Sequence, residues 1–272
     1  MELLCPRKGQ HKTFCMRFPN IFQTILLIFL LIIFHLLLTR FITLSEQDNL
    51  KNLIVSAIKV VVLIGSISIL SKQGSIDNQN VGIKRPNLYL YLMSVVIGIL
   101  IVFNPTLGSI SFFNVEDIIK YADSIMAKPV DVYVFLNVVI LTPILEELLC
   151  RRVIFSGLKS NYNTVTALFL SSLLFGVFHI DVLEATVFGL WLGWIFLKTK
   201  DLLLCITVHS VCNLISFGFR VIAKVDPEKT VSIYILENEV IISTIMFALV
   251  IILFYLSAKK DGFVSRELEK QR

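Results

Sequence analysis

The sequence predicts an all-α, polytopic integral membrane protein with about eight transmembrane helices. Hydrophobic residues make up 56% of the 272 residues and charged residues only 17%, with a mean hydropathy of +0.81. Ordinary globular domains contain about 45–50% apolar and about 25% charged residues. The apolar residues also gather in runs long enough to cross a bilayer, which a soluble protein does not need.

Eight apolar stretches have roughly the length that a membrane span requires. They are Ile21–Leu38, Leu53–Leu70, Leu88–Phe103, Val130–Phe155, Thr164–His179, Val182–Leu197, Leu202–Ile222 and Val240–Leu256. The first run is too long for the apolar region of a signal peptide and lacks a small-residue cleavage site, so we interpret it as a retained helix. Asn104–Pro129 is polar enough to hold a surface helix at Val115–Ala127. No linker suggests a soluble domain, so we expect one transmembrane domain over residues 1–272, with a catalytic core at about 130–222.

The distribution of Lys and Arg predicts the orientation. If the N-terminus is inside, 17 of the 25 basic residues fall in the inner segments and seven in the outer ones, and Lys59 lies within the second helix. Basic loops stay in the cytoplasm, so both termini are expected there, in a cell membrane that we take to be bacterial. Because the bases do not cluster on a soluble face, we expect no nucleic-acid partner. The lipid bilayer is the expected partner instead.

The fourth stretch contains charges that a membrane helix does not need. Glu146, Glu147 and Arg151 lie in an otherwise apolar segment, and each charge at membrane depth costs several kcal/mol unless it is paired. Glu147 and Arg151 are four residues apart, so they share a helix face and can form an ion pair. Glu146 is rotated about 100° away from them, so its partner must come from another part of the chain.

Two histidines and one asparagine are the candidate partners. His179 ends the fifth stretch, and His209 and Asn213 share a face of the seventh by their spacing of four residues. Polar groups in a membrane face the bundle interior and seek one another, because lipid offers no hydrogen bonds. We therefore expect one polar cluster, and the active site, inside the bundle. Straight upright helices would place the two histidines at different depths, so tilt, staggered helix ends or a bend near Gly176 is required.

This set of side chains supports hydrolysis. A poorly solvated carboxylate can take a proton from water and return it to a leaving amine. The imidazoles can orient that water or share it with a metal ion, and Asn213 can donate to the oxyanion on the scissile carbonyl. Ser210 and Cys212 have no base at helical spacing to activate them as nucleophiles.

The motifs resemble those of a known family. Glu146-Glu147-x-x-x-Arg151, Phe175-x-x-x-His179 and His209-x-x-x-Asn213 follow one another on separate apolar helices. This arrangement is similar to the three signature motifs of the CAAX prenyl endopeptidase and bacteriocin-processing family, called CPBP or Abi, of intramembrane proteases. The match covers about Leu141–Leu214.

The resemblance implies an intramembrane endopeptidase that cleaves a membrane-associated peptide or a lipid-modified protein, by CAAX-type or by bacteriocin or leader processing. By resemblance Glu146 activates water with the help of His179 and His209, and Asn213 is the oxyanion donor. Glu147 and Arg151 form a supporting pair. We favour a glutamate mechanism that requires no cofactor, because the chain has no H-E-x-x-H helix. Zinc is the alternative, and its ligands would be Glu146, His179 and His209.

Three other interpretations are kept. The polar cluster could serve only helix packing, as interhelical amides often do. A proton-coupled transporter also places Glu, His and Arg in the membrane, although the chain shows no pair of broken helices in two corresponding halves. A non-catalytic bacteriocin self-immunity protein could retain the fold of the protease.

Overall fold

The computed structural model describes residues 19–42, 48–72, 88–102 and 129–225, together with residues 245, 248, 249 and 252. All the elements within these ranges are helices. They are α1 (Ile21–Phe41), α2 (Asp48–Lys72), α3 (Leu88–Val102), α6 (Val132–Phe135), η1 (Leu136–Leu141), α7 (Thr142–Glu147), η2 (Leu148–Phe155), α8 (Ser156–Asn161), α9 (Thr164–Val177), α10 (Val182–Thr199) and α11 (Leu202–Val225). The predicted all-α class is therefore confirmed.

Helices form at seven of the eight predicted stretches. Within the described ranges, five are long and apolar enough to span a membrane, namely Ile21–Phe41, Asn49–Ser71, Val132–Asn161, Val182–Thr199 and Leu202–Ile222. The helices at the third and fifth stretches, Tyr91–Val102 and Thr164–Val177, are shorter. The eighth stretch, Val240–Leu256, falls outside the described residues apart from four isolated positions, and so does the predicted surface helix at Val115–Ala127. The chain is a polytopic membrane protein, while the count of eight stays a prediction.

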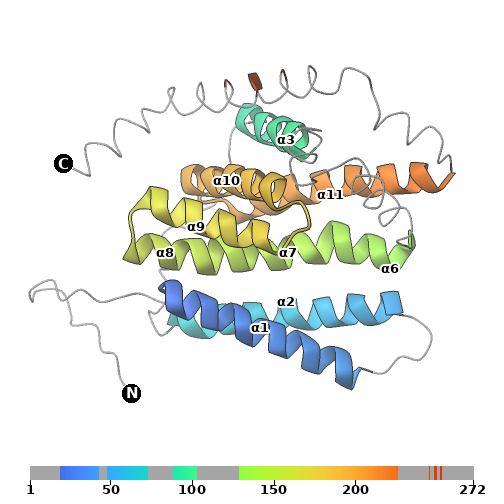
Figure 1. Ribbon diagram of the computed structural model, residues 1–272, viewed down its shortest axis with the longest axis horizontal. Helices are drawn as coiled ribbons and strands as arrows, with labels where there is room; N and C mark the ends of the chain where they lie inside the picture. The colour runs from blue at the N-terminus through green and yellow to red at the C-terminus, as the bar shows by residue number, and fades with distance from the viewer. Residues whose placement is uncertain are drawn as a thin grey trace, which may run out of the picture.

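The helices pack in layers around α10. Figure 1 shows α1 and α2 along one side, the rod formed by α6 to α8 beside them, then α9, α10 and α11, with α3 on the opposite side. In α1 most apolar side chains are exposed and none is fully buried, as expected for a helix that faces lipid. Trp191 and Trp194 of α10 are buried and stack at 5.0 Å between ring centroids, and Trp191 donates to the Ser94 carbonyl of α3. Among the five described helices that are long enough to span a membrane, α10 is the most buried.

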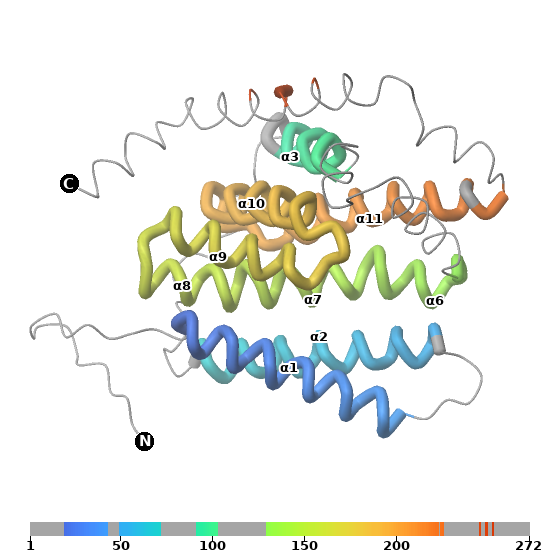
Figure 2. The backbone as a smooth tube through the Cα atoms, viewed as in Figure 1, coloured from blue at the N-terminus to red at the C-terminus, as the bar shows by residue number. Residues whose placement is uncertain are grey.

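The rod from Val132 to Asn161 is one continuous helix of 30 residues in which the hydrogen-bonding pattern changes (Figure 2). Its segments η1 and η2 are π-helical, with each N–H bonding five residues back, whereas α7 between them is α-helical. Such π segments often occur at functional sites, and here they flank Glu146 and Glu147 at the end of α7. The sequence analysis did not predict them.

The α9–α10 interface is close because small residues line it. The ideal Cβ position of Gly189 lies 3.3 Å from Ser172 Cα, and that of Gly193 lies 2.5 Å from Leu168 Cδ1. A Cβ at Gly189 would be tight against the backbone of α9, and a Cβ at Gly193 would displace the Leu168 side chain. Gly189-x-x-x-Gly193 therefore serves close packing of the two helices.

Asp131 caps the N-terminus of the rod. Its Oδ1 accepts hydrogen bonds from the N–H groups of Tyr133 (2.8 Å) and Val134 (2.9 Å), and its Oδ2 accepts from Asn49 Nδ2 (2.6 Å). The bond from Val134 is the main cause of the lowered pKa of Asp131; partial burial opposes that shift, and the bonds from Asn49 and Tyr133 add to it.

We expect Asp131→Ala to destabilise the folded protein by about 1 kcal/mol at neutral pH, the usual loss for an N-cap. A carboxylate whose pKa is lowered on folding stabilises the protein above its unfolded pKa of about 3.9, and this contribution disappears as the pH falls through the lowered folded pKa. Thermal unfolding of the purified protein from pH 7 to pH 3 measures this. Asp131→Asn keeps the cap without the charge, so it should lose little stability at pH 7. Equal melting temperatures for wild type and Asp131→Ala at pH 7 would contradict the assignment.

Candidate active site

Glu147, Arg151 and His209 form a buried polar cluster at the centre of the bundle. Glu147 Oε2 lies 3.0 Å from Arg151 Nε, and Glu147 Oε1 lies 3.0 Å from His209 Nδ1. The side chains of Glu147 and Arg151 are fully buried, and that of His209 is 4% exposed. The pair expected from helical spacing is present. The link from Glu147 to His209 was missed, because residues 62 positions apart leave no signal in the spacing.

The neighbouring Glu146 faces two imidazoles with one oxygen. Its Oε2 lies 3.9 Å from His179 Nε2 and 3.7 Å from His209 Nε2. The side chains of Glu146 and His179 are 27% and 35% exposed, whereas that of Glu147 is fully buried. Glu146 Oε2 itself is buried and has no hydrogen-bond partner. The structure thus brings together Glu146, His179 and His209, three of the four residues that the sequence analysis selected as catalytic. Their catalytic roles remain predictions.

A helical hairpin explains why His179 reaches the depth of Glu146. The rod ends at Asn161, the chain turns at Tyr162 and Asn163, and α9 runs back along η2. Glu146 and His179 are each about 16 residues from this turn, so an antiparallel pair of helices puts them at the same level.

The sequence analysis placed His179 at the end of the helix, and this was wrong by two residues. The helix α9 ends at Val177, and the His179 N–H bonds the Gly176 carbonyl in a tight turn towards α10. Gly176 allows this turn because it has no side chain. A Cβ at this position would collide with atoms of α10, including the Val182 carbonyl oxygen at 2.6 Å.

Each of the two imidazoles is oriented by a hydrogen bond at Nδ1, the ring nitrogen that does not face Glu146. His179 Nδ1 lies 2.8 Å from the Phe175 carbonyl oxygen, and His209 Nδ1 lies 3.0 Å from the Glu147 carboxylate. Both neighbours can only accept hydrogen bonds, so each Nδ1 carries the proton and donates it. In the neutral ring, each Nε2 then presents a lone pair towards Glu146.

Phe175 packs at the centre of these groups. Its ring centroid lies 4.5 Å from that of His179 and 5.8 Å from that of His209, and the Arg151 guanidinium lies 5.2 Å from it. Phe188 of α10 contacts the other side of His209, at 5.4 Å between centroids. The sequence analysis quoted Phe175 in a motif without a role, and it did not select Phe188. Both hold the imidazoles in an apolar setting.

Asn213 contacts the rod instead of the glutamates. Its Nδ2 donates to the Val138 carbonyl oxygen at 2.9 Å. In η1 the Thr142 N–H bonds the Asn137 carbonyl, and the same register would pair the Val138 carbonyl with the nitrogen of Pro143. Proline has no N–H, so this carbonyl needs a donor from another helix, and Asn213 supplies it. The second N–H of the amide is left for another acceptor.

Lys59 of α2 also lies near the site. It falls on the same helix face as the buried residues Ser56, Val60 and Leu63, and α2 packs against α7. The Glu146 carboxylate attracts its ammonium group electrostatically. The sequence left open whether Lys59 pairs with an acid, because nothing in the helical spacing identifies a partner on another helix.

The ligand set proposed for zinc can be compared with these distances. Two ligands of a tetrahedral Zn²⁺, each about 2.0–2.1 Å from the ion, lie roughly 3.4 Å apart. The separations from Glu146 Oε2 to the two Nε2 atoms are wider, at 3.7 and 3.9 Å. Within the part of the chain that the structure describes, no group of three or more His, Cys, Asp or Glu side chains is arranged to hold a metal ion. The donor types suit zinc, but their spacing in this structure does not fit it.

Comparisons with known proteins match the region that carries the site. The family model described as "Type II CAAX prenyl endopeptidase Rce1-like" matches residues 128–215. The chain is 33% identical over 91 residues to "Putative membrane peptidase YdiL" of Bacillus subtilis (strain 168). That alignment covers 32% of this chain and 36% of the relative, so the chain matches about a third of the relative's length. No solved structure matches the chain.

Proposed function

Because the chain is a membrane protein of the CPBP family, with its Rce1-like region at residues 128–215, we propose that it is an intramembrane endopeptidase in which Glu146 activates the hydrolytic water. The main support is the position of one carboxylate oxygen, Glu146 Oε2, 3.7 and 3.9 Å from two imidazole nitrogens. At these separations the groups do not bond directly, and one water molecule can bridge them. Glu146 Oε2 is buried and has no hydrogen-bond partner, so it is free to accept from such a water, and the partly exposed side chains of Glu146 and His179 allow a substrate to approach.

The proposed reaction follows from which groups accept protons. The water donates one hydrogen to Glu146 and the other to an imidazole Nε2, and its lone pair points at the scissile carbonyl carbon. Glu146 takes the proton as the C–O bond forms, and then passes it to the leaving nitrogen as the C–N bond breaks. The products are a carboxylic acid and an amine.

Two further groups assist in this proposal. The oxyanion accepts a hydrogen bond from the second N–H of Asn213, the first being used by Val138. Glu147 is a positioning residue, since it fixes the tautomer of His209 and stabilises the ring if it becomes protonated. The pair with Arg151 keeps the Glu147 carboxylate charged for this purpose.

The test of hydrolysis uses purified full-length protein in detergent with a pool of proteome-derived peptides, read by mass spectrometry. We expect new peptide ends with wild type, and a loss of at least about 100-fold with His209→Ala, since general acid–base groups contribute about 10²–10⁴-fold. His35→Ala is the matched control, because His35 lies in α1, outside the cluster of Glu146, His179 and His209. Equal cleavage by wild type and His209→Ala would contradict the proposal.

We also propose that no metal ion is required. The expected result is that activity survives exhaustive chelation and that metal analysis of the active protein finds less than one zinc per chain. Activity that disappears on chelation and returns with added Zn²⁺ would establish the alternative, in which Glu146, His179 and His209 move together as ligands.

The substrate in this proposal is a peptide or a lipid-modified protein held in or at the bilayer, processed in the CAAX manner or as a bacteriocin or leader. Both termini are proposed to lie in the cytoplasm, as the basic segments suggest. Comparing the peptides that accumulate when the gene is deleted would identify the substrate.

A further inference from the structure

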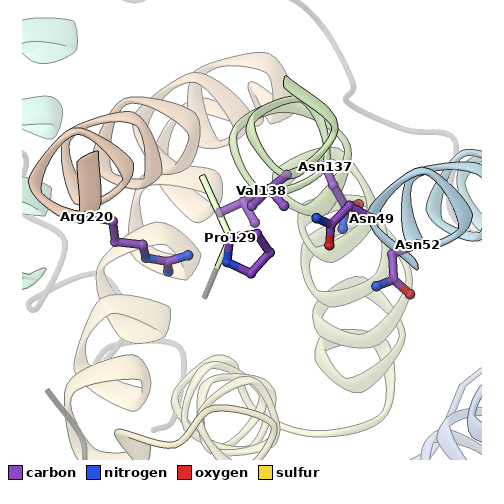
Figure 3. A pocket seen from close by; sticks show the side chains of 7 residues that line it. Asn49, Asn52, Pro129, Asn137, Val138 and Arg220 are labelled. Carbon is purple, nitrogen blue, oxygen red and sulfur yellow. The ribbon is translucent and has the colours of Figure 1, made fainter. Parts of the chain in front are cut away.

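A cavity of about 270 Å³ lies at the end of the bundle where α2 and α6 begin and α11 ends. Its lining includes Asn49 and Asn52 of α2, Pro129 just before the rod, Asn137 and Val138 of the rod, and Arg220 of α11. Figure 3 shows Arg220 reaching across from α11 towards Pro129, with the two α2 asparagines on the opposite side. Three helices that are distant in sequence thus contribute polar side chains to one space.

The charge of this cavity is not balanced. Among the described residues, its lining holds the Arg220 guanidinium and no carboxylate. Asp131 lies two residues after the lining residue Pro129 in the sequence. Its carboxylate oxygens already accept hydrogen bonds from Tyr133, Val134 and Asn49. Among the interactions of the described residues, none pairs an anion with Arg220. A half-buried arginine that faces amides and no anion is suited to bind an anion from outside the chain.

A second polar group in the lining also lacks a partner. Asn137 Oδ1 is buried and accepts no hydrogen bond. An acceptor of this kind is satisfied by an N–H group, whereas Arg220 is satisfied by an anionic oxygen. A peptide that carries a carboxylate can provide both if the Asn137 side chain rotates towards the cavity, since the main chain of the peptide supplies N–H donors. A phosphate dianion would satisfy only the arginine.

The cavity adjoins the candidate active site. Val138 lines it, and the carbonyl of Val138 accepts the hydrogen bond from Asn213. Glu146 is eight residues further along the rod, roughly 12 Å at the rise of a helix. An extended peptide covers that distance in about four residues. A peptide held at Glu146 can therefore place a nearby carboxylate in the cavity.

We propose that this cavity is a carboxylate-binding subsite, in which Arg220 holds an anionic group of the peptide substrate a few residues from the scissile bond. The proposal rests on the proposed function, because it takes a peptide as the ligand. Asn49, Asn52 and Arg220 lie outside the region matched by the family model, so that match does not include the positive charge of the subsite.

The test measures binding without hydrolysis. Full-length protein carrying Glu146→Gln is placed in phosphatidylcholine nanodiscs, and fluorescence anisotropy follows three probes: dansyl-Leu-Ala-Ala-Leu with a free carboxyl end, the same peptide as its C-terminal amide, and dansyl-Leu-Ala-Glu-Leu-amide. We expect a carboxylate-bearing probe to bind at least about tenfold more tightly than the uncharged amide, as a charge-assisted bond gives. Selectivity for the first probe identifies a chain terminus as the source of the carboxylate, and selectivity for the third identifies an acidic side chain.

Added substitutions locate the effect. Arg220→Gln should reduce the preference for carboxylate to less than about twofold, and Arg220→Lys should retain part of it. Lys224→Gln removes an exposed positive charge one turn further along the same helix and should leave the preference unchanged. Equal binding of charged and uncharged probes, a preference that survives Arg220→Gln, or no binding of any probe would each overturn the subsite.

A lipid phosphate is the competing occupant. If phosphatidylglycerol nanodiscs abolish the carboxylate preference and raise the thermal stability in an Arg220-dependent manner, the cavity binds a lipid headgroup and the proposal is wrong. The binding result is also independent of the cleavage assay. Carboxylate-selective binding without cleavage by wild type would contradict the proposed peptidase function and support the subsite. Cleavage without a carboxylate preference would support the peptidase function and contradict the subsite.

Discussion

The Glu146→Gln variant is expected to fold normally and to lose peptide hydrolysis by about 10³-fold or more, the largest effect on activity that we predict. Glutamine has nearly the same shape as glutamate, but its amide cannot take a proton from water. The partial exposure of Glu146, at 27%, means that this change breaks no buried ion pair. Cleavage of the peptide pool by purified protein measures the loss, and thermal unfolding checks the fold.

A matched control separates the site from the general loss of a membrane carboxylate. Glu184→Gln removes another partly buried carboxylate, at the start of α10, that is not part of the candidate site. We expect it to keep nearly full activity. Wild-type activity in a folded Glu146→Gln protein would remove Glu146 from the mechanism, and equal losses in both variants would show that the effect is not specific.

Replacing Arg151 by Met is expected to have the largest effect on stability, about 3–5 kcal/mol. The reason is that Glu147 is fully buried, so without the guanidinium its charge is left uncompensated. The loss of the stacked contact with Phe175 adds to this effect. Thermal unfolding followed by tryptophan fluorescence measures the change, since Trp191 and Trp194 are buried in the same core.

The double variant Glu147→Leu/Arg151→Met tests the physical reason. Removing both charges takes away the uncompensated ion, so the double variant should be more stable than Arg151→Met alone. It should still be inactive, because His209 Nδ1 has lost its acceptor. Lys159→Met, at a more exposed basic position on the same rod, should change stability little. A double variant less stable than the single one would show that Glu147 stabilises the fold even without Arg151, which would contradict the explanation by an uncompensated charge.

Local patterns in the sequence predicted a large part of this protein. Hydropathy located seven helices within the described residues, because a bilayer requires every backbone group to be bonded within its own segment. The spacing of four residues predicted the pair of Glu147 and Arg151, since neighbours on one helix face meet without any knowledge of the fold. The cost of a charge in the membrane predicted that Glu146 would have partners among the few polar side chains of other helices.

Contacts between helices were decided only by the tertiary structure. The bond from His209 to Glu147, the bond from Asn213 to the Val138 carbonyl and the proximity of Lys59 to Glu146 all join residues 62 or more positions apart. The change from α-helical to π-helical bonding in the rod and the early end of α9 depend on how the neighbouring helices pack.

For Glu146 and Glu147, the sequence determined that two carboxylates lie side by side inside a membrane helix and that one of them faces Arg151. The tertiary structure decided how they differ. Glu147 is sealed between Arg151 and His209, and Glu146 is left partly exposed towards two imidazoles. The physical reason is that adjacent residues on a helix point about 100° apart, so each meets a different neighbour, and only the packing of α9 and α11 against the rod determines which neighbour that is.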